Sequence, residues 1–269
     1  MSLIKYDESL TIHHIGFRNL GATCYFNALL QSMLSCTSFI DEIISHKNEV
    51  EYTNNPITKL IIEFVELLKY YEDLCQNNDT KSEDPEIISN IRDTQTKLNN
   101  YSPQIWKHMI LRLCKKKNIP IAQFMQGQQC AGEGFHYLLE AIEEFQNIQN
   151  LFLHRYKSLI RCFDCDKWVS NVDCMYNLFE VEPDLKLAQS EEFDQYNIET
   201  KNMNEFLTKQ SSYVDKDYIC PECKKRGEKY RMNALVMVPE VLVVMSKKYT
   251  VEQKLDVYTH FPKELTFTG

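Results

Sequence analysis

Two Cys-x-x-Cys pairs set the strongest constraint on how this chain can fold. The first is Cys162-Phe-Asp-Cys165 and the second is Cys220-Pro-Glu-Cys223, with 54 residues (166–219) between them. Four thiolates in two such pairs suit a tetrahedral Zn²⁺ ion with no open coordination position, as in structural zinc sites. One pair alone could be a redox dithiol, but two pairs favour zinc. The pattern predicts that Cys162, Cys165, Cys220 and Cys223 bind one structural Zn²⁺, which brings two distant turns together.

Composition narrows the class of protein. The chain has 269 residues, of which 43% are hydrophobic and 25% charged, so it can bury a sizeable core as one domain or two closely packed ones. Its formal net charge of −8 argues weakly against nucleic acid and suits a basic protein partner better. The N-terminus lacks a signal-peptide core, and the longest apolar stretch (234–245) is broken by Pro239, so no membrane segment is expected. Ten cysteines without an export signal favour a reducing compartment, and the predicted location is intracellular, cytoplasmic or nuclear.

Apolar periodicity changes from helical to strand-like along the chain. Spacing along one face predicts a helix that begins near Cys24 and further helices over 57–68 and 105–113. We interpret the polar segment between them, 72–100, as an exposed connection with a short helix from Ile87. From about residue 150 the pattern predicts strands, including 172–181 and the β-branched stretch that breaks at Pro239.

Cys24 lies at the start of the first predicted helix, in Gly16-Phe-Arg-Asn-Leu-Gly-Ala-Thr-Cys-Tyr-Phe-Asn-Ala-Leu-Leu-Gln31. Gly21 and Thr23 mark the loop and the N-cap before that helix. The unpaired N–H groups and the positive end of the helix dipole favour a thiolate there, as a nucleophilic cysteine requires. Asn19 could donate its carboxamide N–H to an oxyanion. The alternative is a buried structural cysteine, which is the more common situation for a lone cysteine on an amphipathic helix.

The segment from Gly16 to Gln31 closely resembles the cysteine box of the ubiquitin-specific protease family, which are cysteine isopeptidases with a papain-like core. The resemblance implies that Cys24 is the nucleophile and Asn19 the oxyanion donor. A second segment, 128–139, is similar to the family's Gln-Gln-Asp-Ala-x-Glu-Phe-Leu box, which helps to bind the extended ubiquitin tail. The residues that this similarity assigns to tail binding are Gln128, Gln129 and Glu133.

The second box departs from the family at two positions. Cys130 replaces an aspartate and Gly134 replaces an aromatic or large apolar residue. The aspartate would hold basic residues near the ubiquitin C-terminus, so its loss should weaken tail binding by roughly ten- to a hundredfold. His136 in the same segment is interpreted as a surface or core residue.

The resemblance also gives a role to the second half of the chain. In the family, the two zinc knuckles cap long strands called the fingers, which hold the globular body of ubiquitin. Segment 172–181 matches the strand after the first knuckle, and 183–217 would be a loop-rich finger insertion. Pro239-Glu-Val-Leu-Val and His260-Phe-Pro-Lys-Glu-Leu265 resemble palm strands that lead towards the catalytic histidine.

No catalytic histidine can be assigned from the sequence. The family's base lies in a Gly-His-Tyr context after the Phe-Pro-x-x-Leu segment, and no Gly-His-Tyr occurs here. His260 precedes the Phe-Pro pair, and neither His13 nor His14 matches the family's base. One hypothesis is a deubiquitinating peptidase whose histidine-bearing end is absent from this chain or comes from elsewhere. The other is an inactive pseudo-deubiquitinase that binds ubiquitin or acts as a scaffold. A zinc-ribbon module for nucleic acid is disfavoured by the acidic balance.

These observations predict an α+β, papain-like cysteine protease core with a helical thumb, a β-rich palm and zinc-ribbon fingers. Residues 1–15 would be an N-terminal extension, 16–149 the thumb with the cysteine box, and 150–269 the fingers and palm, incomplete at the C-terminus. The expected partners are ubiquitin or a ubiquitin-like modifier and ubiquitinated proteins, within a larger assembly, with no membrane and no nucleic acid.

Overall fold

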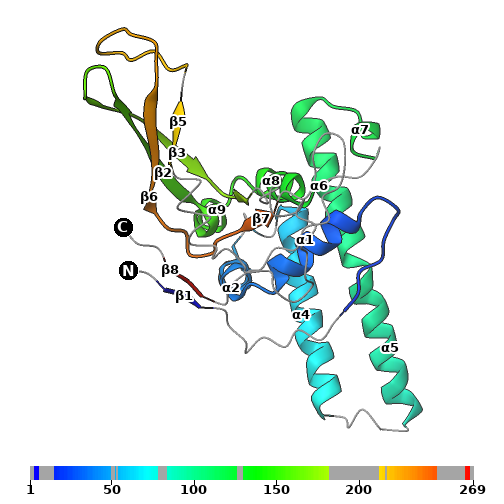
Figure 1. Ribbon diagram of the computed structural model, residues 1–269. Helices are drawn as coiled ribbons and strands as arrows, with labels where there is room; N and C mark the ends of the chain where they lie inside the picture. Colours follow the sequence, from blue (N-terminus) through cyan, green and yellow to red (C-terminus); the bar gives the residue numbers. More distant parts are fainter. Residues whose placement is uncertain are drawn as a thin grey trace, which may run out of the picture. The chain divides into compact units, whose positions relative to one another are not determined.

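The computed structural model describes residues 3–5, 15–49, 52, 54–77, 84–125, 130–181, 212–215, 217–246 and 264–266. The chain divides into two compact units (Figure 1). We call Ser9–Leu151 the helical unit, and Met1–Glu8 together with Phe152–Gly269 the β unit. Helices and strands are therefore segregated along the sequence, as in an α+β protein.

The helices enclose an apolar core. They are α1 (Cys24–Leu34), α2 (Thr37–Ser45), α4 (Pro56–Asn77), α5 (Pro85–Asn99), α6 (Tyr101–Lys117), α7 (Ala122–Met125), α8 (Ala131–Ala141) and α9 (Gln146–Phe152). Fully buried side chains from α1, α4, α6 and α8 meet in this core, among them Phe26, Ile61, Met109 and Phe135. The three helices predicted from one-face periodicity are confirmed as α1, α4 and α6, because each places its apolar stripe on this core.

The polar connection after α4 is more helical than the sequence suggests. A helix is present where one was expected from Ile87, but α5 begins at Pro85 and has 15 residues, so the helix is longer than predicted. Asp84 caps the helix, since its side chain accepts a hydrogen bond of 2.9 Å from the backbone N–H of Glu86, and Pro85 occupies the first turn. Only Thr94 and Leu98 of this helix are buried, so its apolar stripe is too sparse to give a clear periodic signal.

The β unit is built around a four-stranded antiparallel sheet with the order β3-β2-β6-β5. Its strands are β2 (His154–Cys162), β3 (Trp168–Tyr176), β5 (Ser212–Asp215) and β6 (Lys229–Met237). Figure 1 shows β2, β3 and β6 as long neighbouring strands. Two further pairs complete the described part: β4 (Phe179–Val181) runs parallel to β7 (Val244–Ser246), and β1 (Leu3–Lys5) runs antiparallel to β8 (Glu264–Thr266).

In the β unit, two sequence expectations change in detail and a third is confirmed. The strand predicted over 172–181 is divided into β3 and β4. The predicted break at Pro239 is confirmed, because β6 ends before it and β7 begins after it. Part of the expected N-terminal extension is a strand, since Leu3–Lys5 pairs with Glu264–Thr266. Most of the expected finger insertion lies outside the described residues.

Within the described ranges, no helix combines the length and the apolar character that a membrane crossing requires.

Candidate active site and metal centre

Cys24 is the first residue of α1, and its side chain is exposed. The helix starts here because the backbone N–H of Asn27 donates to the carbonyl of Thr23 at 3.0 Å. The buried face of α1, which includes Phe26 and Leu30, turns towards the core and leaves Cys24 outside. An exposed thiol at a helix N-terminus fits a nucleophile better than a structural core cysteine.

The loop before Cys24 fixes the orientation of the Asn19 side chain. The Asn19 Oδ1 atom accepts hydrogen bonds from the Gly21 N–H and from the Thr23 hydroxyl, both at 3.0 Å. Thr23 Oγ1 also accepts from the Leu20 N–H at 3.0 Å, so Thr23 braces the loop and does not cap α1 through its side chain. Because the carbonyl end of the Asn19 amide is engaged, its NH₂ end is the part that can donate to a substrate oxygen.

Two further polar residues of α1 tie this loop to the helix. Asn27 Nδ2 donates to the carbonyl oxygens of Phe17 and Arg18, each at 3.4 Å. One turn later, Gln31 donates to the Ile15 carbonyl. Neither residue was assigned a role from the sequence, although their spacing of four places both on one helix face and could have indicated a shared contact.

Tyr25 is the residue that follows Cys24 in the sequence, and its ring contacts the neighbouring helices α6 and α8. Its hydroxyl accepts a hydrogen bond of 3.0 Å from Trp106 Nε1, and burial raises the pKa of this phenol. The ring lies against Gly134 of α8, where an added Cβ would come within 2.8 Å of Tyr25 Cε2. The departure from the family at Gly134 therefore leaves room for this ring.

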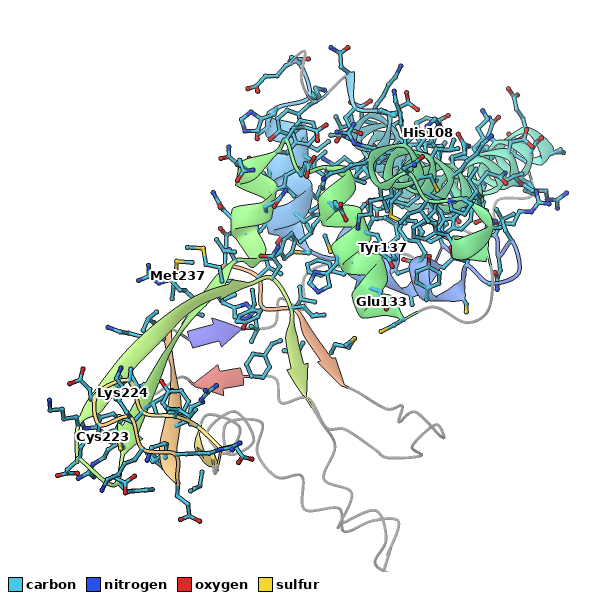
Figure 2. The ribbon with its side chains drawn as sticks, turned by 90° about the horizontal axis from the view of Figure 1, so that it is seen from above. His108, Glu133, Tyr137, Cys223, Lys224 and Met237 are labelled. Carbon is cyan, nitrogen blue, oxygen red and sulfur yellow. The ribbon has the colours of Figure 1, made fainter. Side chains whose placement is uncertain are left out.

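α8 carries the candidate tail-binding box. Cys130 is the exposed N-cap residue of α8, and Glu133 lies exposed in the first turn, where the helix dipole favours a negative charge. Glu133 and Tyr137 are one turn apart on this helix (Figure 2). Burial is the main cause of the raised pKa of Tyr25, and the charges of Glu133 and Cys24 are smaller contributions in the same direction. These two candidate site residues therefore lie near the same tyrosine.

Several candidates cannot be placed. Gln128 and Gln129, as well as His13, His14 and His260, lie outside the described residues. His136 is an exposed residue of α8 whose ring contacts Phe135. No described residue is assigned as the base for Cys24.

The four cysteines of the two Cys-x-x-Cys pairs converge on one point. Their Sγ atoms all lie within 4.8 Å of one another. Cys162 Sγ is 3.7 Å from Cys223 Sγ, and Cys165 Sγ is 3.9 Å from Cys220 Sγ. A tetrahedral zinc–thiolate centre with bonds of about 2.3 Å requires sulfur–sulfur distances of about 3.8 Å. The donor set therefore fits Zn²⁺ in both chemistry and size.

The two knuckles share one backbone geometry. The N–H of the first cysteine in each pair donates across the turn at 3.0 Å, from Cys162 to the Lys167 carbonyl and from Cys220 to the Lys225 carbonyl. The residue after each second cysteine, Asp166 or Lys224, has a positive φ, of 56° and 60° respectively. Figure 2 shows Cys223 and Lys224 at one end of the sheet and Met237 at the other.

The pKa values of the two thiols in the first knuckle are shifted in opposite directions. Burial raises the pKa of the Cys162 thiol, but hydrogen bonds from the Cys165 backbone and from Lys229 outweigh it and lower the pKa to about 6. A backbone hydrogen bond from Lys167 lowers the pKa of Cys165, but burial and the neighbouring thiols raise it to about 11. A bound dication would favour the ionised form of all four sulfurs.

Comparison with known proteins places this chain in a family. The family described as "Ubiquitin carboxyl-terminal hydrolase" matches residues 15–268. The chain therefore belongs to the ubiquitin carboxyl-terminal hydrolase family. It is 43% identical over 68 residues to "Ubiquitin carboxyl-terminal hydrolase 37" of Mus musculus, an alignment that covers 25% of this chain and 6% of the relative. It is 20% identical over 266 residues to "Ubiquitin carboxyl-terminal hydrolase 12" of Salmo salar, which covers 95% of this chain and 66% of the relative.

Solved structures share the fold. The chain resembles "Structure of the SAGA Ubp8/Sgf11/Sus1/Sgf73 DUB module bound to ubiquitin aldehyde" with a TM-score of 0.58 and 18% identity, over 93% of this chain and 51% of that chain. For the related "Structure of the Ubp8-Sgf11-Sgf73-Sus1 SAGA DUB module" the TM-score is 0.54 at 16% identity, over 93% of this chain and 50% of that one. The predicted α+β fold of the ubiquitin-specific protease type is thereby confirmed. The chain spans about half the length of these structural neighbours.

Proposed function

We propose that this chain is a ubiquitin-specific cysteine protease that hydrolyses isopeptide bonds at the C-terminus of ubiquitin. The observation that carries the proposal is the exposed Cys24 at the start of α1, next to a loop that engages the carbonyl end of the Asn19 amide. Family membership supports this class of reaction.

The proposed chemistry uses the two residues in separate roles. The Cys24 thiolate attacks the carbonyl carbon of ubiquitin's terminal glycine, and the NH₂ group of Asn19 donates to the oxyanion that forms. The C–N bond then breaks, the amine leaves with a proton, and water hydrolyses the thioester. The general base is a histidine that this proposal leaves unassigned, with His260, His13 and His14 as the residues to test.

The remaining roles follow from the same proposal. Gln128, Gln129 and Glu133 bind the ubiquitin tail, and the tetrathiolate centre holds a structural Zn²⁺ in the fingers. The substrates are proteins that carry ubiquitin or a ubiquitin-like modifier, in the cytoplasm or the nucleus. The solved neighbours are assemblies of several chains, which supports a larger complex for this chain as well.

Reaction with ubiquitin that carries a C-terminal electrophile tests the proposal. We expect intact mass to show one covalent adduct, which Cys24→Ala abolishes. Cys130→Ala is the matched control because Cys130 is the other exposed cysteine at the start of a helix, and it should leave the adduct in place. Hydrolysis of a fluorogenic ubiquitin amide would establish turnover, whereas a folded chain without adduct would refute the peptidase assignment.

The second candidate is an inactive ubiquitin-binding or scaffold protein. Cys130 favours it, because the thiol replaces the aspartate that would hold the basic tail. Cys130→Asp is expected to tighten ubiquitin binding by roughly ten- to a hundredfold. Calorimetry that detects binding without an adduct would support this candidate. The absence of both binding and adduct would overturn the two candidates together.

A further inference from the structure

Lys229 is the one lysine of the described residues that has no solvent-exposed surface at all, with a relative exposure of 0%. Lysine is almost never fully buried unless its charge is paired. Lys229 is the first residue of β6 and pairs directly with Cys162 of β2. Side chains of directly paired residues leave the sheet on the same face, so the lysine is brought beside a metal ligand by the strand register.

The ammonium group of Lys229 has two polar neighbours inside the first knuckle. Nζ donates to Asp164 Oδ2 at 2.6 Å. The ammonium is also close enough to the Cys162 side chain to help, after the Cys165 backbone, to lower the pKa of that thiol. Asp164 Oδ2 in turn lies 3.9 Å from Cys162 Sγ. The buried cation therefore binds the same carboxylate oxygen that contacts the Cys162 sulfur, and it lies on the same face of the sheet as that sulfur.

The ion pair between Lys229 and Asp164 does not by itself explain why the lysine side chain is buried. The Asp164 side chain keeps 35% of its surface exposed, so water can solvate this carboxylate without a lysine. The ammonium, in contrast, is removed from water and needs acceptors. The hydrogen bond from Lys229 is the main cause of the lowered pKa of Asp164, and the positive charge of the exposed Lys225 lowers it further. A lysine at the surface could therefore also neutralise this carboxylate.

We propose that Lys229 is a positioning residue of the metal centre, whose ammonium donates to the Cys162 thiolate and holds it in place to bind Zn²⁺. This inference rests on the zinc assignment above. A tetrathiolate that holds a dication keeps a net negative charge, and a donor to sulfur draws part of that charge away from the metal. Partners of this kind, outside the ligands themselves, typically change metal affinity by about ten- to a hundredfold.

The test is a zinc competition against a chromophoric chelator with the full chain and four variants. Lys229→Met keeps the apolar stem and removes the charge, and we expect it to weaken zinc binding by about ten- to a hundredfold. Asp164→Asn should have little effect, and the double variant should remain as weak as Lys229→Met. Lys225→Met is the matched control, since it removes a nearby exposed charge, and it should bind zinc like the unaltered chain.

The double variant separates a role at sulfur from a role at the carboxylate. If Lys229 served only to neutralise Asp164, Lys229→Met with Asp164→Asn would restore zinc binding, and the proposal would be overturned. Wild-type affinity in Lys229→Met alone would overturn it as well.

Cobalt substitution checks that the variant still folds. The sulfur-to-cobalt charge-transfer absorption of Lys229→Met should keep the intensity of four thiolate ligands, because the cysteines themselves are unchanged. A Lys229→Met chain that lacks this absorption in excess cobalt would show a collapsed site and would count against a positioning role. An unaltered chain without it would refute the zinc assignment and this inference together.

Discussion

At the scale of single residues, the approach of α8 to α1, the helix that begins with the candidate nucleophile, depends on the absence of one side chain. Gly134 faces the Tyr25 ring, and the hydroxyl of that ring is held by Trp106. The aromatic ring cannot swing away as the end of a lysine could, because it is buried and hydrogen-bonded. The absence of a side chain at position 134 thus allows the Tyr25 ring, next to Cys24, to lie where it does.

Gly134→Ala should therefore destabilise the helical unit. Its Cβ would lie 2.8 Å from Tyr25 Cε2, so ring or helix must shift. Overpacking of this kind costs about 1–3 kcal/mol, which chemical denaturation would measure. Gly16→Ala is the matched control, because no atom lies within 4 Å of its added Cβ. Equal stability of the two variants would contradict the packing argument.

The Thr23 hydroxyl offers a second prediction at this scale. Thr23→Val keeps the shape of the side chain but loses the donor to Asn19 Oδ1, so the amide of Asn19, the proposed oxyanion donor, should become less well oriented. If the chain turns over a fluorogenic ubiquitin amide, we expect kcat to fall by about two- to tenfold, the value of one hydrogen bond. Thr23→Ser should retain the rate. A Thr23→Ser variant as slow as Thr23→Val would assign the effect to packing.

The sequence indicated the identities of the candidate site residues better than their contacts. The helix start at Cys24 could be predicted, because a loop with glycine precedes a clear apolar stripe. The hydrogen bonds of Asn19 and the buried position of Lys229 could not be predicted from the sequence. They depend on loop geometry and on strand register, which local sequence patterns do not encode.

At the scale of elements, the end of α2 is held by a charged and aromatic cluster. His46 lies between Glu42 and Glu49, with nitrogen–oxygen distances of 3.1 Å and 2.6 Å. Its ring stacks on Tyr52, with centroids 4.8 Å apart, and Tyr52 stacks on Phe145 at 4.3 Å. The C-terminus of α2 is thereby linked to the residue that precedes α9.

Stability should depend on pH through His46. The hydrogen bond to Glu49 raises the pKa of His46 above its ordinary value of 6.5, and the carboxylate charges add to this despite some desolvation. A raised folded-state pKa means that the stabilisation is present below the unfolded-state pKa and is lost as pH rises through the folded-state pKa. The difference in free energy of unfolding between the wild-type chain and His46→Gln should therefore shrink from about pH 6 to about pH 8. A constant difference would exclude this linkage.

Elements were predictable where their pattern was strong. α1, α4 and α6 bury continuous stripes, whereas α5 buries only Thr94 and Leu98, so only a short helix was predicted there. The division of the predicted strand into β3 and β4 comes from pairing with two different partners, β2 and β7. Such partner changes arise from tertiary contacts, and a run of β-prone residues does not reveal them.

At the scale of the whole molecule, the four cysteines of the two Cys-x-x-Cys pairs all belong to the β unit, and the candidate nucleophile Cys24 belongs to the helical unit. A metal ion bound by these four cysteines would close the long connection from 166 to 219 and so would stabilise strands that are distant in sequence. The candidate zinc ligands and the candidate nucleophile thus belong to different compact units of the chain.

Removal of metal should act on one unit more than on the other. After treatment with a chelator, we expect faster amide hydrogen exchange in β2, β3 and β6, which meet at the knuckles. The core of α1, α6 and α8 should keep its protection, because its buried contacts do not involve the cysteines of the zinc site. Mass spectrometry of peptic fragments resolves the two regions. Equal loss of protection in both would show that the units unfold as one.

The pairing of β1 with β8 has a consequence for synthesis on the ribosome. Leu3–Lys5 is translated before the helical unit, whereas its partner Glu264–Thr266 is translated after it. The intervening helical unit is continuous and can close as soon as Leu151 has left the exit tunnel. The helical core can therefore form before β1 meets β8, so the pairing of these two strands is a late step of folding during synthesis.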